Sequence, residues 1–317
     1  MTSGTAKEPI RGGTKPHLAL IMVQIMFGTW PLVGKVVLRS IPSTGLVAIR
    51  VAGAAIALTL VQKIANQRRK ISRKDLGWLA LCSVLGVVLN QLLYLKALSL
   101  TTVINSTLLA TTIPVFTLMV GAALGYDRLS WRKVIGIGTA GLGVIYLIDP
   151  FRAEFSQATT LGNVLNVANS LSYGAYIVLS KDLVKRYGAL NVLTWMFMMG
   201  CLITTPVGAV ALARTPLLDL GWQVWLGLIY IILVPTVGAY YLNAWALARV
   251  EPSTVATYIY LQPVIAFALA PVILGEALSA RTGLACLLIF AGVAIVIWRG
   301  RDPTVQQVAE HPEALGH

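Results

Sequence analysis

Long apolar runs alternate with short polar stretches along almost the whole chain. A helix needs about 20 mostly apolar residues to cross a bilayer core about 30 Å thick. Within lipid the backbone must satisfy its own hydrogen bonds, so these runs are predicted to be helices. The predicted transmembrane helices are at 17–38, 44–62, 76–96, 102–124, 131–148, 160–181, 189–213, 222–247, 253–274 and 282–298. The pattern therefore predicts an all-α membrane protein with ten transmembrane helices.

The second half of the sequence repeats the first half. Pro114 recurs 149 positions later as Pro263, and Asp127 recurs as Glu276. Further matches at this offset are Ala97-Leu98 with Ala246-Leu247, Leu129-Ser130 with Leu278-Ser279, Arg132 with Arg281, and Gly143-Val144 with Gly292-Val293. Near the start of each half, Gly28, Trp30 and Lys35 match Gly174, Tyr176 and Lys181 at an offset of 146. So many matches at two nearly equal offsets indicate an internal duplication.

The duplication predicts a first repeat at 17–149 and a second repeat at 160–299. Each repeat holds five predicted helices, and an odd number of crossings makes the second repeat start from the opposite side of the membrane. Inverted repeats of this kind are found in many secondary transporters, which bind substrate between the repeats near the middle of the bilayer. The sequence therefore predicts two inverted five-helix repeats with a shared central site.

Charge and composition define the environment of the protein. The chain is 57% hydrophobic and 12% charged, with a mean hydropathy of +0.77, whereas a soluble domain has about 25% charged residues. Lys and Arg gather in the short loops, mostly on the side of the N-terminus, and such loops are usually cytoplasmic. Cytoplasmic tails are therefore predicted at 1–16 and 300–317, in a plasma (bacterial inner) membrane protein. The net charge of +13 is explained by topology, and no nucleic-acid partner is predicted.

Residue types that hold metals or cofactors are sparse. Cys82, Cys201 and Cys286 each stand alone in an apolar run, and His17 is the only histidine before the C-terminal tail. No phosphate-binding, dinucleotide-binding or metalloprotease motif is found. We therefore predict neither a cofactor nor a metal nor enzymatic activity. The predicted partners are a small-molecule metabolite and the lipid bilayer, and homodimerisation is left open.

Three segments carry a family resemblance: Lys15-Pro16-His17-Leu18-Ala19, Leu89-Asn90-Gln91-Leu92-Leu93-Tyr94-Leu95 and Ile113-Pro114-Val115-Phe116-Thr117. The two halves resemble the paired EamA domains of the drug/metabolite transporter superfamily over residues 17–299. They are most similar to the plant nodulin-type branch, which includes amino-acid and auxin facilitators. The resemblance implies ten spans, a central cavity, alternating access and amino acids as the substrate class. Asp127 departs from the usual Glu of these repeats, while Glu276 keeps it.

Polar side chains recur at helical spacing inside several predicted spans, although polar groups that face lipid are costly. Asn90 and Tyr94, for example, lie one helical turn apart in the third span. Such faces should point inward, where they would either line a wet cavity or form hydrogen bonds between helices, each worth under about 1 kcal/mol. Because they converge from equivalent helices, we predict a substrate-binding cavity. Its predicted residues are Gln24, Trp30, Asn90, Tyr94, Asn166, Tyr173, Tyr240, Asn243, Tyr258 and Gln262, with Asn169 or Ser170 on the same face as Asn166.

Five further residues are predicted to act in gating or at helix ends, namely Arg50, Pro114, Pro263, Asp127 and Glu276. A proline in mid-helix removes a backbone hydrogen bond and kinks the helix, so Pro114 and Pro263 would either shape the cavity or merely be tolerated by packing. Arg50 is a charge inside a predicted span and hence a candidate for a substrate or gate contact. It lies near the start of its span, so snorkelling to the outer interface is the alternative.

These features predict a secondary transporter of a small organic metabolite. No Asp or Glu falls near the middle of a predicted span, where a proton carrier would be expected. We therefore predict an uncoupled facilitator or exchanger, although sodium could still bind carbonyls freed by the two prolines. The alternatives are a drug or toxin exporter driven by an ion gradient and, from a different class, a membrane assembly or sensor subunit. A membrane enzyme acting on lipids would need clustered acids or histidines, and the sequence has none.

Overall fold

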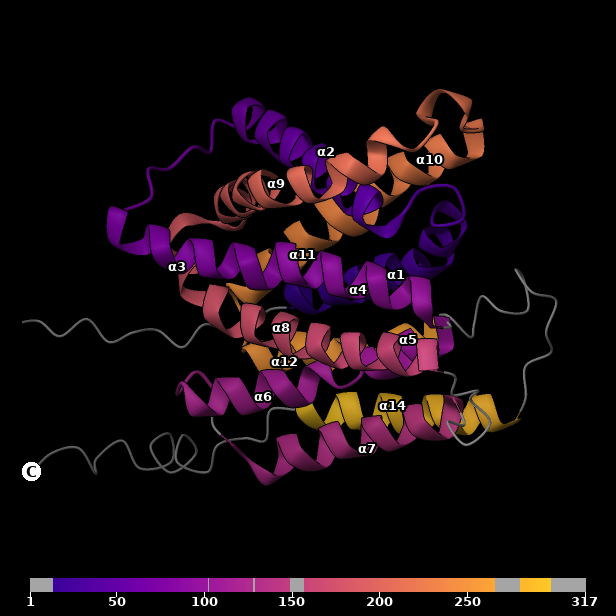
Figure 1. The fold of residues 1–317 in the computed structure, drawn as a ribbon. Helices are drawn as coiled ribbons and strands as arrows, with labels where there is room; N and C mark the ends of the chain where they lie inside the picture. Colours follow the sequence, from indigo (N-terminus) through magenta and orange to yellow (C-terminus); the bar gives the residue numbers. More distant parts are fainter. Residues whose placement is uncertain (1–13, 102, 128, 149–156, 266–279, 298–317) are drawn as a thin grey trace, which may run out of the picture.

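The computed structural model describes residues 14–101, 103–127, 129–148, 157–265 and 280–297, and within these ranges every regular element is a helix (Figure 1). The predicted all-α class is therefore confirmed for the described part of the chain. Five helices in it are long and apolar enough to cross a membrane: Thr14–Val37, Ser43–Ile64, Arg73–Leu100, Ala189–Ala213 and Trp222–Leu247. Glu276, residues 1–13 of the predicted first tail and the whole predicted last tail lie outside the described residues, while residues 14–16 belong to the first helix.

The described residues of the first half form eight elements, some of which join end to end. They are α1 (Thr14–Val37), α2 (Ser43–Ile64), α3 (Arg73–Ser83), the π-helix η1 (Val84–Leu89), α4 (Asn90–Leu100), α5 (Val103–Ala110), α6 (Ile113–Ala123) and α7 (Trp131–Ile148). The helix that starts at α3 is capped by Ser72, whose side-chain oxygen accepts a hydrogen bond from the Asp75 backbone N–H at 3.2 Å. It then runs without interruption through η1 to the end of α4.

The second half follows the same order. It contains α8 (Gln157–Tyr187), α9 (Ala189–Ala213), the 3₁₀-helix η3 (Leu217–Asp219), α10 (Trp222–Ile231), the π-helix η4 (Ile232–Gly238), α11 (Ala239–Leu247), α12 (Pro252–Thr257), the 3₁₀-helix η5 (Tyr258–Tyr260) and α14 (Ala280–Ile297). Gly188 separates α8 from α9 with a φ of 84°, a conformation that glycine adopts without a steric penalty. The chain can therefore reverse direction between two long helices with a single residue.

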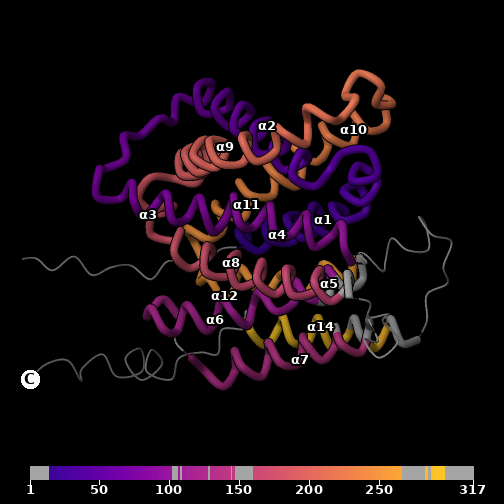
Figure 2. The backbone as a smooth tube through the Cα atoms, viewed as in Figure 1, coloured from indigo at the N-terminus to yellow at the C-terminus, as the bar shows by residue number. Residues whose placement is uncertain are grey.

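Helices of the two halves interlock in a reciprocal way. The predicted second spans of the two halves, α2 and α9, pack on each other, and so do the predicted fifth spans, α7 and α14 (Figures 1 and 2). Each predicted third span packs on the predicted first span of the other half, since α4 contacts α8 and α11 contacts α1. Each contact between two helices thus has an equivalent contact in which the two halves are interchanged, as expected from the duplication.

The pair α7 and α14 approach each other at two glycines. A Cβ atom added at Gly136 would lie 2.8 Å from the backbone oxygen of Gly292, and one added at Gly292 would lie 2.6 Å from the backbone oxygen of Gly136. Backbone atoms cannot move aside as flexible side chains can, so only glycine fits at this crossing. Small residues commonly permit such close approach between membrane helices.

We expect the Gly136→Ala variant to unfold at a lower temperature than wild type, because overpacking costs about 1–3 kcal/mol. Gly138 is the matched control on the same helix, since a Cβ atom there would meet nothing within 4 Å. Gly138→Ala should leave the melting temperature unchanged or raise it, because alanine is the better helix former. Thermal unfolding of both variants in detergent makes the comparison. Equal melting temperatures for the two variants would contradict the close crossing.

The fourth span differs from its prediction, because α5 ends at Ala110 and a separate helix, α6, begins at Ile113. The prediction of one helix kinked at Pro114 is therefore wrong. A proline ring clashes with the carbonyl four residues earlier, which here is that of Ala110. Pro114 instead occupies the first turn of α6, where a missing N–H is harmless.

The ninth span is interrupted at the equivalent place. Its helix α12 gives way to the 3₁₀-helix η5, and α-helical backbone resumes at residues 261–265, with Pro263 in that first turn. The third spans of both repeats also share a feature that the sequence did not predict, because η1 and η4 are π-helical segments at equivalent positions. Single-turn π-helices are frequent at functional sites, since they leave backbone carbonyls without their usual partners.

Candidate functional site

A cavity of about 70 Å³ lies between the two halves. Its lining comes from α1, α2, α4, α5, α6, α8, α11 and the interrupted ninth span. The lining residues are Phe27, Trp30, Arg50, Asn90, Gln91, Tyr94, Ala110, Ile113, Asn169, Tyr173, Tyr240, Ile259 and Gln262. Larger depressions of about 510 and 490 Å³ occur elsewhere. The first lies on an exposed face of α8 and the second at the ends of α8 and α11, so neither joins the cores of the two halves.

Four pairs of lining residues occupy equivalent positions in the two repeats. At an offset of 146 or 149 these are Phe27 with Tyr173, Gln91 with Tyr240, Ala110 with Ile259, and Ile113 with Gln262. Gln91 and its own equivalent Tyr240 touch, since Gln91 Nε2 donates a hydrogen bond to the Tyr240 hydroxyl at 3.0 Å. The two halves are related by a pseudo-twofold axis, and a residue can contact its equivalent in the other half only near that axis. The cavity therefore lies on that axis.

A polar network centres on the Tyr240 hydroxyl. Besides the bond from Gln91, this oxygen lies 2.7 Å from Asn90 Oδ1 and 3.2 Å from the Gly86 carbonyl oxygen. Asn90 Nδ2 in turn donates to Asn169 Oδ1 at 2.8 Å. The network ties α4, α8 and α11 together, and it covers a carbonyl of the π-helix η1. No buried side-chain N or O atom in the described residues lacks a hydrogen-bond partner.

The second π-helix is tied to α2 in a similar way. The Thr236 hydroxyl donates to the Ile231 carbonyl at 2.7 Å, five residues back along the chain, as π-helical geometry allows. The same hydroxyl oxygen accepts a hydrogen bond from Arg50 Nε. Each π-helical segment thus presents a polar group to the centre of the protein.

Arg50 is turned into the protein interior. Its side chain is 2% exposed, and its guanidinium carbon lies 4.1 Å from the centroid of the Trp30 ring, a cation–π geometry. These contacts exclude the snorkelled orientation that the sequence left open. Among the described residues no carboxylate forms an ion pair with Arg50.

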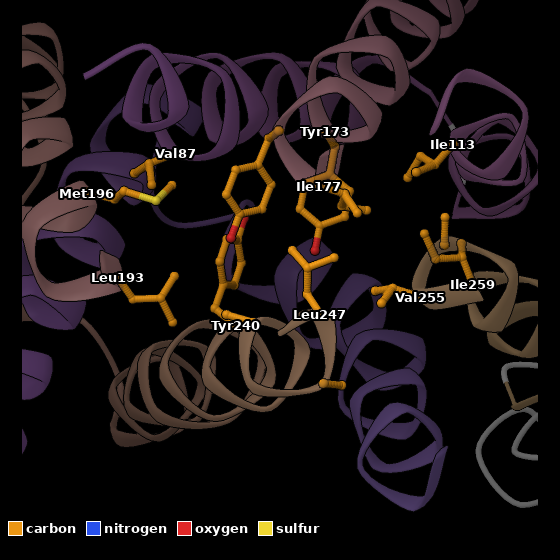
Figure 3. Packing of buried hydrophobic residues seen from close by; sticks show 14 of the residues in the cluster. Val87, Ile113, Tyr173, Ile177, Leu193, Met196, Tyr240, Leu247, Val255 and Ile259 are labelled. Carbon is orange, nitrogen blue, oxygen red and sulfur yellow. The ribbon is translucent and has the colours of Figure 1, made fainter. Parts of the chain in front are cut away.

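Aromatic rings surround the polar network. Tyr173 and Tyr240 approach from the facing helices α8 and α11 (Figure 3), with ring centroids 6.2 Å apart. The ring centroid of Phe27 lies 6.1 Å from that of Tyr240, and the ring centroid of Trp30 lies 6.2 Å from that of Tyr94. Such a wall presents apolar ring faces to a ligand, while the hydroxyls of Tyr173 and Tyr240 are held by hydrogen bonds to neighbouring helices.

The model of the EamA-like transporter family matches this chain twice, at residues 14–148 and 160–298. The chain belongs to the EamA-like transporter family. Its two matched segments are the two halves that the internal duplication indicates, and the family predicted from the sequence is confirmed. It is therefore an integral membrane transporter.

Relatives of this EamA-like transporter come from all three domains of life. It is 26% identical to an uncharacterised transporter of Archaeoglobus fulgidus, covering 68% of this chain and 74% of that protein. It is 25% identical to a WAT1-related protein of Arabidopsis thaliana (90% and 78% covered) and 25% identical to the uncharacterised transporter YetK of Bacillus subtilis (93% and 90% covered). A crystal structure with 19% identity superposes with a TM-score of 0.71 over 90% of this chain and 97% of that one, which shows a shared fold.

The predicted binding residues of the EamA-like transporter fall into three groups. Trp30, Asn90, Tyr94, Tyr173, Tyr240 and Gln262 line the cavity, as does Arg50. Gln24 and Asn243 do not line the cavity but contact residues that do. Gln24 accepts a hydrogen bond from Gln262 at 2.8 Å, and Asn243 donates one to Tyr173 at 3.3 Å. Asn166 and Tyr258 lie away from the lining. Asn166 forms a hydrogen bond with Ser106 at 3.1 Å, and Tyr258 forms one with His17 at 2.8 Å. Pro114 and Pro263 are buried next to the lining residues Ile113 and Gln262 without lining the cavity themselves.

Sequence reasoning missed several lining residues. Phe27 and Gln91 are the equivalents of Tyr173 and Tyr240, so the repeat offsets could have identified them. Asn169 lies on the polar face that the sequence indicated, without being chosen over Ser170. Ala110, Ile113 and Ile259 are apolar and gave no signal of their own, because their place in the cavity follows from the helix interruptions.

Asp127 does not line the cavity and belongs to a separate polar cluster. Its buried carboxylate accepts hydrogen bonds from the Ser253 hydroxyl at 2.7 Å and the Ser253 N–H at 3.2 Å. Lys133 Nζ bridges Asp127 Oδ1 at 2.8 Å and Glu251 Oε2 at 2.6 Å. The cluster fastens the start of α7 to the start of α12.

Proposed function

We propose that this EamA-like transporter moves a small organic metabolite by alternating access at the central cavity, with amino acids, especially aromatic or apolar ones, as its substrates. The pairing of equivalent residues around the cavity carries the proposal, because inverted-repeat transporters handle substrate at the repeat interface. The aromatic wall and the amide side chains of Asn90, Gln91 and Gln262 suit an apolar body with a polar head. The resemblance to amino-acid facilitators of plants supports the same class.

We further propose that the protein has ten transmembrane helices in two inverted repeats, at 17–149 and 160–299. It would lie in the plasma (bacterial inner) membrane with both termini in the cytoplasm. Two observations support it, namely the distribution of Lys and Arg among the loops and the reciprocal packing of the two halves.

Transport requires the cavity to enlarge. A water molecule occupies about 30 Å³ in the liquid and pockets for drug-sized ligands have about 300–1,000 Å³, so a cavity of about 70 Å³ suits a few waters. The interruptions between α5 and α6 and at η5 border the cavity in equivalent places. Short breaks of this kind let helix halves tilt separately, and we propose that they open the cavity to each side in turn.

We propose an uncoupled facilitator or exchanger, because none of the described lining residues is an acid that could carry a proton. Purified protein in liposomes should exchange labelled for unlabelled phenylalanine saturably. With equal phenylalanine on both sides, an imposed pH or sodium gradient should produce no net accumulation, and empty liposomes serve as the control. Accumulation driven by either gradient would overturn the uncoupled mechanism and favour an ion-driven exporter. Failure to exchange any amino acid would overturn the substrate class.

A further inference from the structure

Arg50 is a buried cation in the wall of the cavity. Among the described residues that line it, Arg50 alone carries a charge. It is the eighth residue of α2, and its partner Thr236 lies in η4, well inside the eighth span. Holding an arginine in a low-dielectric interior without a counter-ion is costly, so an intramembrane charge of this kind indicates function.

The hydrogen-bonding capacity of Arg50 is only partly used. A guanidinium has five N–H donors in a planar fork. Nε donates to Thr236, and one face of the group rests on Trp30, but the two terminal nitrogens form no hydrogen bond with a described residue. Since no buried side-chain nitrogen in the described part of the chain lacks a partner, these two nitrogens are accessible from the cavity. The fork is thus fixed at its base and open at its tip.

We propose that Arg50 binds the carboxylate of the transported substrate through its two terminal nitrogens. A carboxylate matches the guanidinium fork with two parallel hydrogen bonds and supplies the missing negative charge. The fixed Nε contact and the Trp30 ring orient the fork before the substrate arrives, which reduces the entropic cost of binding. This inference rests on the proposed transport function and specifies which chemical group the site recognises.

The described lining of the cavity offers no carboxylate to pair with an amino group. Its other described lining side chains are aromatic, amide or aliphatic, and an ammonium ion would find neither a carboxylate nor relief from repulsion by Arg50. We therefore infer that the substrate class is small monocarboxylates with an apolar or aromatic body. Amino acids belong to this class through their carboxylate, and the same acids without the amino group should bind at least as well.

Charge at one end of the molecule favours the same ligands. The depression of about 490 Å³ at the ends of α8 and α11 is lined by Arg69, Lys185 and Arg249, and no described residue of its lining is acidic. Its wall includes Tyr241, the residue next to Tyr240 of the central cavity. A concave cationic surface raises the local concentration of small anions.

The test compares three probes that share one aromatic body: 3-phenylpropanoate, 3-phenylpropanamide and phenethylamine. Binding to the purified protein in detergent is measured by calorimetry, which does not depend on transport. We expect the carboxylate to bind about ten- to a hundredfold more tightly than the amide or the amine, as hydrogen bonds to a charged group imply. This comparison uses the wild-type protein and needs no variant to fold.

Variants then assign the effect to Arg50. Arg50→Gln should remove the preference for the carboxylate over the amide, and Arg50→Lys should keep part of it, since lysine retains the charge without the fork. Arg214→Gln, at an exposed position after α9, is the control and should behave as wild type.

The proposed carboxylate site is overturned if the carboxylate binds no more tightly than the amide and the amine, or if none of the probes binds. It is also overturned if Arg50→Gln keeps the full preference for the carboxylate. Transport by counterflow is measured separately in liposomes. Saturable counterflow of the amine or amide would leave the proposed transport function standing while the carboxylate site fails.

Discussion

Replacing Tyr240 by Phe should reduce transport by about five- to a hundredfold while the aromatic packing stays in place. The lost hydroxyl accepts from Gln91 and lies within hydrogen-bond distance of Asn90 Oδ1 and the Gly86 carbonyl. A buried polar group that loses its partner costs about 1–3 kcal/mol, and the network on the repeat axis would lose three contacts at once. Initial rates of counterflow in liposomes measure the effect.

The neighbouring Tyr241 provides the control for this prediction. It lies on the same helix but lines the depression at the ends of α8 and α11 instead of the central cavity. Tyr241→Phe removes the same atom outside the central cavity and leaves the charged residues of that depression unchanged, so its counterflow should equal that of wild type. If the two variants transport equally well, the axial network serves packing alone and the cavity is not the site of transport.

Replacing Asp127 by Ala should destabilise the protein by about 3–5 kcal/mol, the usual cost of removing one partner from a buried ion pair. The Asp127 side chain is 0% exposed and accepts from Lys133 and from two groups of Ser253. Its loss would leave a largely buried ammonium and a buried serine N–H without this partner. The free energy of unfolding in mixed detergent micelles gives the measurement.

Glu251 supplies a matched comparison, because it pairs with the same Lys133 but its side chain is 51% exposed. Exposed ion pairs contribute about 0–1 kcal/mol, so Glu251→Ala should have a small effect. The difference between the two variants therefore measures burial and not charge number. A loss of stability as large in Glu251→Ala as in Asp127→Ala would refute the bracing role that we assign to Asp127.

The helical spacing of polar residues identified part of the site but did not distinguish the cavity from helix interfaces. The polar faces at Asn90, Tyr173 and Tyr240 were found from helical spacing, and all three residues line the cavity. The same spacing also selected Asn166 and Tyr258, which bond other helices away from the lining. Spacing reports that a face avoids lipid, but a cavity and a helix interface satisfy that requirement equally.

Local sequence alone determined the helical class, most of the helix positions, the duplication and the family. These depend on hydropathy, repeat spacing and short sequence segments, all of which can be read along the chain without knowing which residues meet in space. Only the tertiary structure decided that Pro114 begins a new helix, that π-helices lie at η1 and η4, and that Arg50 turns toward Trp30 and Thr236. Each of these depends on partners from distant segments, because the free carbonyls and the buried charge are stabilised by groups that other helices bring to them.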